Sequence, residues 1–248
     1  MKCLILAAGY ATRLYPLTEN FPKPLLEVGG KPILNWLMDD LNAKGLVDEY
    51  VVVSNHKFAG IFRDWAFCHS ERSEESVPIR VVDDGTSTNE TRLGAVRDIQ
   101  LGIESAAIDD DLLVMAGDNL LSFSLRDFVD YARGKGTTCI MRFYEEDENR
   151  LHKTGVAEVD DNDLVLSMEE KPANPKSHWC CPPFYYIVKQ DVPKVAEAIA
   201  SGCGVDAPGS FIAWLCQHTA VHAWEMPGRR YDIGNLESYK EVKRIFAK

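Results

Sequence analysis

Residues 4–25 read LILAAGYATRLYPLTENFPKPL, a short apolar run followed by a loop with one glycine and two basic side chains. The run from Leu4 to Ala8 is continuous, which is typical of a strand buried on both faces of a parallel sheet. Gly9 lets the backbone that follows approach a ligand closely, and the N–H groups of such a loop can cradle phosphates. Arg13 and Lys23 add positive charge nearby. The stretch therefore predicts a first core strand that leads into a loop, which is either a plain turn with surface cations or a loop that binds phosphate.

Outward from this stretch, apolar runs alternate with helical patterns. In the first part of the chain the pattern predicts strands at 4–8, 50–54, 79–82, 112–116 and 137–143, and helices at 32–44, 57–67, 91–105 and 125–133. After about residue 150 it predicts strands at 155–159, 164–169, 184–188 and 220–225, and helices at 192–200, 210–217 and 236–246. This order favours an α/β fold with an open, mostly parallel sheet and helices on both faces. Since no linker or repeat interrupts it, we expect one domain over residues 1–248.

Composition narrows the classes of function. The chain has 248 residues, a formal net charge of −11 and a sequence pI near 5.0, with its basic residues spread along it. This distribution argues against nucleic acid as a partner. The seven cysteines form no metal-binding spacing, and no apolar run approaches the length of a membrane span. We therefore expect a cytoplasmic protein without a membrane partner, whose phosphate site gathers its few cations locally or recruits a metal.

One polar segment looks inserted. Residues 69–76 read HSERSEES and show no apolar period between a predicted helix and a predicted strand. We expect an exposed loop insertion within residues 68–77 whose deletion leaves activity and stability nearly unchanged.

Three further segments carry polar groups at the ends of predicted strands. Residues 83–95 read DDGTSTNETRLGA, in which Ser87 or Asn89 is suited to cap the next helix, and Asn89 is suited alternatively to contact a ligand. Asp118 follows the strand 112–116, where a carboxylate is suited equally to a structural turn and to Mg²⁺, since ligands collect at the carboxyl ends of parallel strands. Glu170 and Lys171 follow another apolar strand and form a charged turn.

Several of these stretches resemble one family. Four segments closely resemble the N-terminal sequence of the sugar-1-phosphate nucleotidyltransferases. They are LAAGYATRL at 6–14, PLT at 16–18, PKPL at 22–25 and GKP at 30–32. Further resemblance lies in GD at 117–118, EKP at 170–172 and YDIG at 231–234. The family's second loop glycine is Ala11 here, which keeps the N–H donor but adds a methyl group.

The resemblance implies a Rossmann-like, mixed-sheet fold of the nucleotide-diphospho-sugar transferase type. It also implies that a nucleoside triphosphate reacts with a phosphorylated small molecule, with Mg²⁺ as cofactor. The implied nucleotide-binding residues are Ala8, Gly9, Tyr10, Ala11, Thr12, Arg13, Lys23, Asn89 and Gly94. The implied acceptor-binding residues are Asn119, Glu170 and Lys171. The implied metal ligands are Asp118 and Asp232, and the implied catalytic residues are Arg13, Lys23, Asp118 and Lys171.

Some choices stay open at this stage. A pyrimidine fits the 89–94 spacing better than a purine, so we expect dTTP or UTP first, CTP next, and GTP or ATP last. Alternative functions on the same fold are a CTP-dependent cytidylyltransferase for phosphocholine or another non-sugar phosphate, and a non-catalytic sensor or subunit. Arg229 and Arg230 are suited either to a phosphate contact or to an exposed position. The sequence does not indicate an oligomeric state, and we expect no appended β-helix or acetyltransferase domain.

Overall fold

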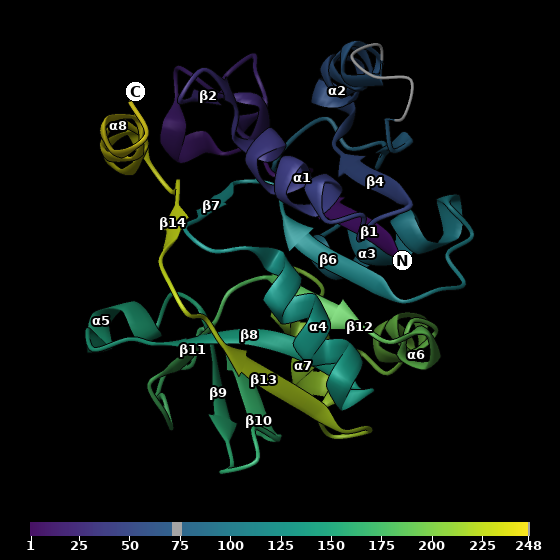
Figure 1. Ribbon diagram of the computed structural model, residues 1–248, viewed down its shortest axis with the longest axis vertical. Helices are drawn as coiled ribbons and strands as arrows, with labels where there is room; N and C mark the ends of the chain where they lie inside the picture. The colour runs from purple at the N-terminus through teal and green to yellow at the C-terminus, as the bar shows by residue number, and fades with distance from the viewer. Residues whose placement is uncertain (71–75, 248) are drawn as a thin grey trace. The chain divides into compact units, whose positions relative to one another are not determined.

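The computed structural model describes residues 1–70 and 76–247 (Figure 1). The chain forms two compact units, each built from segments that are far apart in sequence. Unit 1 comprises Met1–Arg92, Ala116–Arg126 and Gly228–Lys248, and unit 2 comprises Leu93–Met115 and Asp127–Pro227. The expectation of one domain over residues 1–248 stays a prediction.

Unit 1 is built on a small parallel sheet that begins with the apolar run of the sequence. Its order is β1 (Lys2–Leu6), β4 (Glu49–Ser54) and β5 (Ile79–Asp83), with Leu4 beside Val51 and Val52 beside Val81. Their apolar, β-branched side chains favour buried strands. The remaining elements of unit 1 are the turns η1 (Thr12–Leu14) and η2 (Lys23–Leu25), the strands β2 (Glu27–Val28), β3 (Lys31–Pro32), β7 (Asn119–Leu121) and β14 (Arg230–Asp232), and the helices α1 (Ile33–Ala43), α2 (His56–Ser70) and α8 (Leu236–Ile245).

An apolar cluster of unit 1 fixes the loop region that follows β1. Its buried side chains come from the early part of the chain, from β7 and from the C-terminal segment: Leu14, Leu26, Val28, Ile33, Leu120, Ile233, Tyr239 and Val242. Helix α8 begins with a capping box in which the Asn235 side chain accepts the N–H of Ser238 and the Ser238 hydroxyl accepts the N–H of Asn235. This cap and this cluster hold the short strand β14 beside β7.

Unit 2 carries a mixed sheet. Its strand order is β10-β9-β11-β8-β12-β6, and β13 pairs in parallel with β8. The strands are β6 (Leu112–Ala116, its last residue in unit 1), β8 (Thr138–Tyr144), β9 (Gly155–Val159), β10 (Val165–Glu170), β11 (Trp179–Cys181), β12 (Phe184–Ile187) and β13 (Val221–Glu225). The helices and turns are α3 (Ala95–Ser105), α4 (Leu125–Lys135, from Asp127 in unit 2), α5 (Glu148–Leu151), η3 (Lys189–Asp191), α6 (Lys194–Ala200) and α7 (Gly209–Leu215).

The expected order of strands and helices is confirmed, with shifted ends. The largest correction concerns α3, which begins at Ala95 and not at Thr91. Gly94 has a φ of 93°, outside the helical region, and Thr91 instead closes a turn with Thr88. The first strand ends at Leu6, two residues before the expected end, because the backbone at Ala8 already belongs to the loop.

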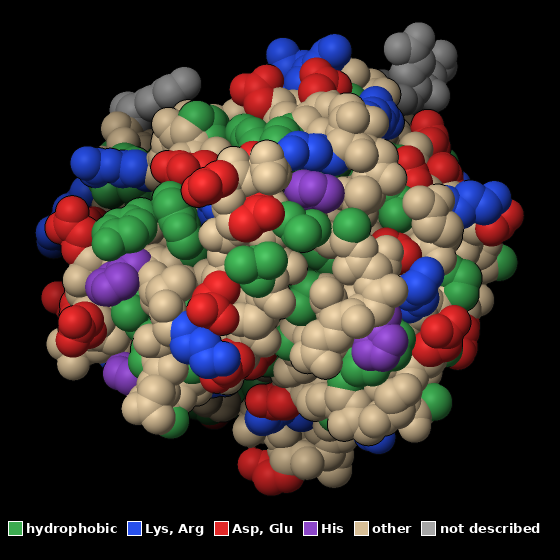
Figure 2. Space-filling view, turned by 90° about the horizontal axis from the view of Figure 1, so that it is seen from below, with side chains coloured by type: hydrophobic (Ala, Val, Ile, Leu, Met, Phe, Trp, Pro, Cys, Tyr) green, Lys and Arg blue, Asp and Glu red, His purple; other side chains and the backbone are tan. Residues whose placement is uncertain are grey.

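The surface and the inserted segment add three observations. On the face drawn in Figure 2, acidic and basic side chains are interspersed and form no large patch of one sign. Within the described residues, none of the helices is long and apolar enough to cross a membrane. Of the expected insertion, residues 71–75 lie outside the described residues, and α2 continues as far as Ser70.

Candidate functional site

The loop after β1 is held in place by a buried asparagine. The Asn55 amide donates to the carbonyl oxygen of Ala8 at 2.9 Å, and its Oδ1 accepts the N–H of Phe58 at the start of α2 at 3.1 Å. Gly9 is exposed, with open space where a side chain would lie. Asn55 therefore fixes the loop while the Gly9 backbone stays accessible. Asn55 was not predicted as a site residue. The polar pair Ser54-Asn55 between an apolar strand and a helix is nevertheless a typical cap signal.

Tyr10 ties the same loop to the segment that follows β5. Its buried hydroxyl donates to the carbonyl oxygen of Thr86 at 3.0 Å. Asp84 accepts the N–H of Thr86 at 2.7 Å, and burial raises the pKa of its carboxyl above the usual value. Neither Asp84 nor Thr86 was predicted as a site residue, because nothing in the local sequence indicates a contact with residue 10.

Ala11 occupies the position at which the chain departs from the family's glycine. Its φ of 48° and ψ of 40° lie in the left-handed region, which costs an L-residue about 1–2 kcal/mol. Its carbonyl oxygen accepts the Thr18 hydroxyl at 2.8 Å and the N–H of Leu14 at 2.9 Å, so the tertiary structure enforces this conformation. The methyl group of Ala11 therefore strains the loop.

We expect Ala11→Gly to raise the free energy of unfolding by about 0.5–1 kcal/mol, because glycine adopts φ > 0 without a steric penalty and only part of that gain is lost to the flexibility of the unfolded chain. Urea unfolding measures the change. Gly45→Ala is the matched control: its φ is 61° with open space around it, so it should destabilise the protein by a similar amount. A loss of stability in Ala11→Gly would contradict the argument.

A partly buried ion pair joins Lys23 of the loop after β1 to Asp118, which follows β6. The Nζ atom of Lys23 lies 2.6 Å from Oδ2 of Asp118, and the Lys23 side chain is 9% exposed against 31% for Asp118. Lys23 belongs to η2, whose residues are all buried, and Asp118 follows β6 in a turn. Gly117 lets the turn that carries Asp118 lie close to η2, because a Cβ atom at position 117 would lie only 3.3 Å from side-chain atoms of Pro24.

The strand pair β7–β14 brings the third motif to the same place. Asp232 lies directly opposite Asn119, the neighbour of Asp118. The fully buried Asn119 donates to Oδ1 of Asp118 at 2.8 Å and accepts from Arg230 at 2.6 Å. Arg230 also lies 3.8 Å from the Asp232 carboxylate. Lys23, Asp118, Asn119 and Asp232 thus gather in unit 1 around one strand pair, and Arg230 belongs to this group.

This group of donors fits a hard divalent cation. Mg²⁺ uses one or two protein carboxylates and completes its shell with water and phosphate oxygens. Asp118 offers a partly exposed carboxylate, and Asp232 is exposed. Among residues 1–70 and 76–247 there is no cluster of three or more His, Cys, Asp or Glu side chains suited to a metal, so a closed protein cage is not the arrangement found there.

Asn89 and Gly94 occupy different surroundings. Asn89 is exposed, and its Oδ1 accepts from Arg92 at 3.1 Å, while the residue before α3 is Gly94. The expectation that Asn89 or Ser87 caps this helix is therefore wrong. Gly94 lies in unit 2, where a side chain would meet the backbone oxygen of Val205 at 2.5 Å. Its glycine identity follows from this close approach and from its positive φ.

Glu170 is the last residue of strand β10 in unit 2, and Lys171 follows it. Glu170 is half-buried, and burial raises the pKa of its carboxyl even though Lys171 and the N–H of Gly209 favour the ionised form. Lys171 is exposed, with a φ of 48°, and its N–H donates to Thr154 at 3.0 Å. Unit 2 thus offers one partly buried carboxylate and one exposed ammonium in consecutive positions.

Arg13, in unit 1, is exposed on η1.

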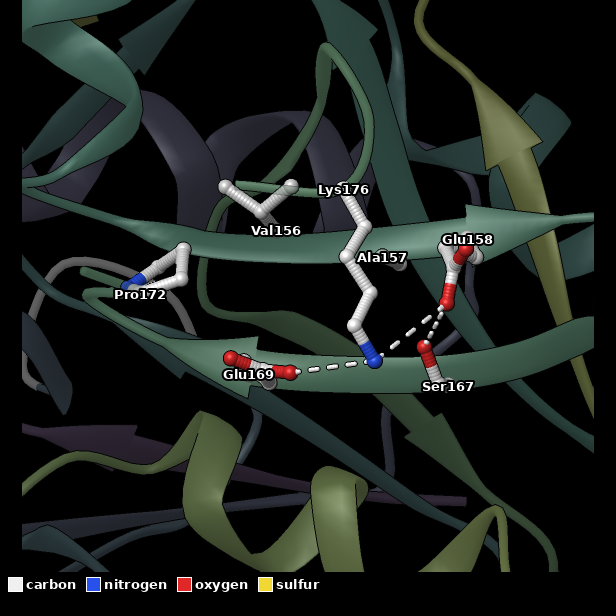
Figure 3. Close-up of a pocket in the computed structure, with 7 residues that line it drawn as sticks. All are labelled: Val156, Ala157, Glu158, Ser167, Glu169, Pro172 and Lys176. Atoms are coloured by element: carbon white, nitrogen blue, oxygen red, sulfur yellow. Dashed lines mark hydrogen bonds and ion pairs between the residues drawn. The ribbon is translucent and has the colours of Figure 1, made fainter. Parts of the chain in front are cut away.

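Figure 3 shows a hollow on unit 2 that is formed by residues around strands β9 and β10. Lys176 lies across both strands, 3.5 Å from Glu169 and 4.0 Å from Glu158, which also accepts the Ser167 hydroxyl at 2.5 Å. None of the predicted site residues lines this hollow, so it is a poorer candidate for a substrate site than the two groups described above.

The chain matches known proteins along its whole length. A family model described as nucleotidyl transferase matches residues 2–248. A UTP–glucose-1-phosphate uridylyltransferase of Haloferax volcanii is 32% identical, over 98% of this chain and 96% of that protein. A glucose-1-phosphate thymidylyltransferase of Streptomyces griseus is 27% identical, over 99% of this chain and 66% of that protein. A solved UDP-glucose pyrophosphorylase in complex with UDP-glucose aligns over 99% of this chain and 97% of its own, with a TM-score of 0.82 and 17% identity.

The chain therefore belongs to the nucleotidyl transferase family. The family and the enzyme class expected from the sequence are confirmed. The likeness to the solved structure confirms the α/β fold class with its open, mixed sheet. The roles of individual side chains stay predictions that the geometry above now makes specific.

Proposed function

We propose that this protein joins a nucleoside triphosphate, UTP or dTTP, to a sugar 1-phosphate and releases pyrophosphate. The relatives named above are glucose-1-phosphate uridylyl- and thymidylyltransferases, which supports glucose 1-phosphate as the first acceptor to test. The observation that carries most weight is the group formed by Lys23, Asp118, Asn119 and Asp232 in unit 1. It places a buried cation and two carboxylates in the unit that also holds the Gly9 loop.

The reaction needs no protein nucleophile. An oxygen of the acceptor phosphate forms a bond to the α-phosphorus, the bond from that phosphorus to the bridging oxygen breaks, and pyrophosphate leaves. Catalysis then rests on positioning and on stabilising negative charge. In this proposal the Gly9 loop and Arg13 bind the triphosphate, Lys23 neutralises it, and Glu170 and Lys171 bind the acceptor. Acceptor binding by Asn119 stays a prediction, and its amide also donates to the Asp118 carboxylate.

Asp118 and Asp232 would hold Mg²⁺, which when bound supplies positive charge to the phosphate oxygens. The amide of Asn119 orients the Asp118 carboxylate through Oδ1, while the ammonium of Lys23 pairs with Oδ2 of the same carboxylate. A cytoplasmic location, and partners that include neither nucleic acid nor membrane, stay predictions.

Pyrophosphate release tests the function directly. UTP, dTTP, CTP, GTP and ATP are each paired with glucose 1-phosphate, with other sugar 1-phosphates and with phosphocholine. Turnover with UTP or dTTP and a sugar 1-phosphate supports the proposal. Turnover with only CTP and phosphocholine would replace it by the cytidylyltransferase alternative, and no turnover with any pair would favour the sensor alternative.

The same assay tests base recognition by Asn89. Since Asn89 is exposed and does not cap α3, Asn89→Ala should leave stability unchanged. If its amide reads a pyrimidine, the substitution should cost about 1–3 kcal/mol in kcat/KM for the preferred nucleotide and reduce the differences among the five triphosphates. Thr88→Ala, one residue earlier in the same exposed turn, serves as control. An unchanged ranking would remove Asn89 from the site.

A further inference from the structure

Two glycines from different elements flank the end of strand β10. Gly155 lies directly opposite Glu170 on the neighbouring strand β9, and Gly209 begins α7. A side chain at Gly155 would meet Cε of Met168 at 2.5 Å and Oε1 of Glu170 at 3.3 Å. A side chain at Gly209 would lie far inside the contact distance of Glu170 Oε1 and 2.7 Å from the same Met168 methyl. The Glu170 carboxylate therefore occupies space that exists because both residues are glycine.

Gly209 also acts on the charge of this carboxylate. Its backbone N–H favours the ionised form of Glu170, whereas burial raises the pKa of the carboxyl. A carboxylate accepts about four hydrogen bonds through two oxygens, so the Glu170 carboxylate has acceptor capacity for a substrate hydroxyl.

The backbone that carries Gly209 is anchored. Four residues earlier, the carbonyl oxygen of Val205 accepts the N–H of Val96 at 3.0 Å, and that of Asp206 accepts the N–H of Ala95 at 3.3 Å. Gly94 packs against the same peptide. The segment that leads to Gly209 is thus attached to the start of α3 through Val205 and Asp206.

We propose that Gly209 is a positioning residue for acceptor recognition, because its missing side chain leaves the space in which the Glu170 carboxylate takes the orientation that binds the acceptor's hydroxyl groups. This inference rests on the proposed function and adds a residue to it. The Glu170 carboxylate is the end of a flexible side chain, whereas the backbone that leads to Gly209 is anchored to α3. A methyl group at position 209 is therefore accommodated by displacement of Glu170, and the fold is kept.

The experiment compares wild type with Gly209→Ala, Glu170→Asp, the double variant and Gly134→Ala, using UTP and glucose 1-phosphate. Gly134 lies in α4 with open space around it, which makes it the matched control. We expect Gly209→Ala to raise the KM for glucose 1-phosphate about 10-fold or more, with the KM for UTP and the urea midpoint close to those of Gly134→Ala. Because the methyl group of the Gly209→Ala variant already displaces the carboxylate, Glu170→Asp should cost less in that background than in wild type.

Three outcomes would overturn the inference while wild type is active. They are an acceptor KM equal to that of Gly134→Ala, a parallel rise in both KM values with a lower urea midpoint, and effects of the two single variants that simply multiply. Inactivity of wild type with every nucleotide and acceptor pair is a different result, since it refutes the proposed function and with it the acceptor site on which Gly209 is argued to act.

Discussion

Asp118→Asn is expected to lower kcat/KM about 100-fold or more. This is one of the two largest effects that we predict for a single substitution. The substitution keeps the size of the side chain but removes the charge that would hold Mg²⁺ and that pairs with Lys23 at 2.6 Å. Removing a preorganised charge from the stabilisation of a transition state typically costs about 10²–10³ in turnover. Steady-state kinetics with pyrophosphate detection, over a range of Mg²⁺ concentrations, measures it.

The same substitution should lower stability. The Lys23 side chain is 9% exposed and would lose its charged partner, which destabilises more than the loss of a surface pair does. Because Asp118 is itself about one-third exposed, we expect about 1–2 kcal/mol in urea unfolding, less than for a fully buried pair. Asp39→Asn is the matched control, since Asp39 pairs with Lys31 at 2.5 Å on the surface. Full turnover of wild type in EDTA, or an active Asp118→Asn enzyme, would refute the metal assignment.

The sequence allowed the loop and the main strands to be predicted, because both are encoded locally. Leu4 to Ala8 is an uninterrupted apolar run, and Gly9, Arg13 and Lys23 follow it within one loop. The alternation of apolar runs with helical patterns then defined the α/β class. What helped most for the site was resemblance, since Asp118 and Asp232 are 114 residues apart and no local pattern links them.

Contacts between distant segments were not predictable from the sequence. Strands β7 and β14 have three residues each, too short to give a period-two pattern. Their pairing is what makes Asn119 a partner of both Asp118 and Arg230. Likewise, the start of α3 depends on how Gly94 packs against Val205, more than a hundred residues later. A single sequence shows neither contact, so the partners of Asn119 were not predicted and the helix was predicted to begin too early.

Lys23→Met is expected to have a comparable effect on activity, with a different signature. Loss of the ammonium removes the charge that would neutralise the triphosphate, so kcat/KM should fall about 100-fold or more. Methionine preserves an unbranched apolar stem in this buried position, which limits the loss of packing. Lys31→Met, which breaks the exposed pair with Asp39, is the control and should be nearly neutral.

A Mn²⁺ binding measurement distinguishes the role of Lys23 from that of Asp118. In wild type the Lys23 ammonium would compete with a metal ion for the Asp118 carboxylate, because it already pairs with Oδ2 of that carboxylate. Without nucleotide, Lys23→Met should therefore bind Mn²⁺ more tightly than wild type in a titration followed by electron paramagnetic resonance, although it turns over more slowly. Asp118→Asn should bind Mn²⁺ more weakly. Weaker Mn²⁺ binding in Lys23→Met would mean that Lys23 supports the metal site through its structure, and the assignment of Asp118 as a ligand shared between ammonium and metal would have to be abandoned.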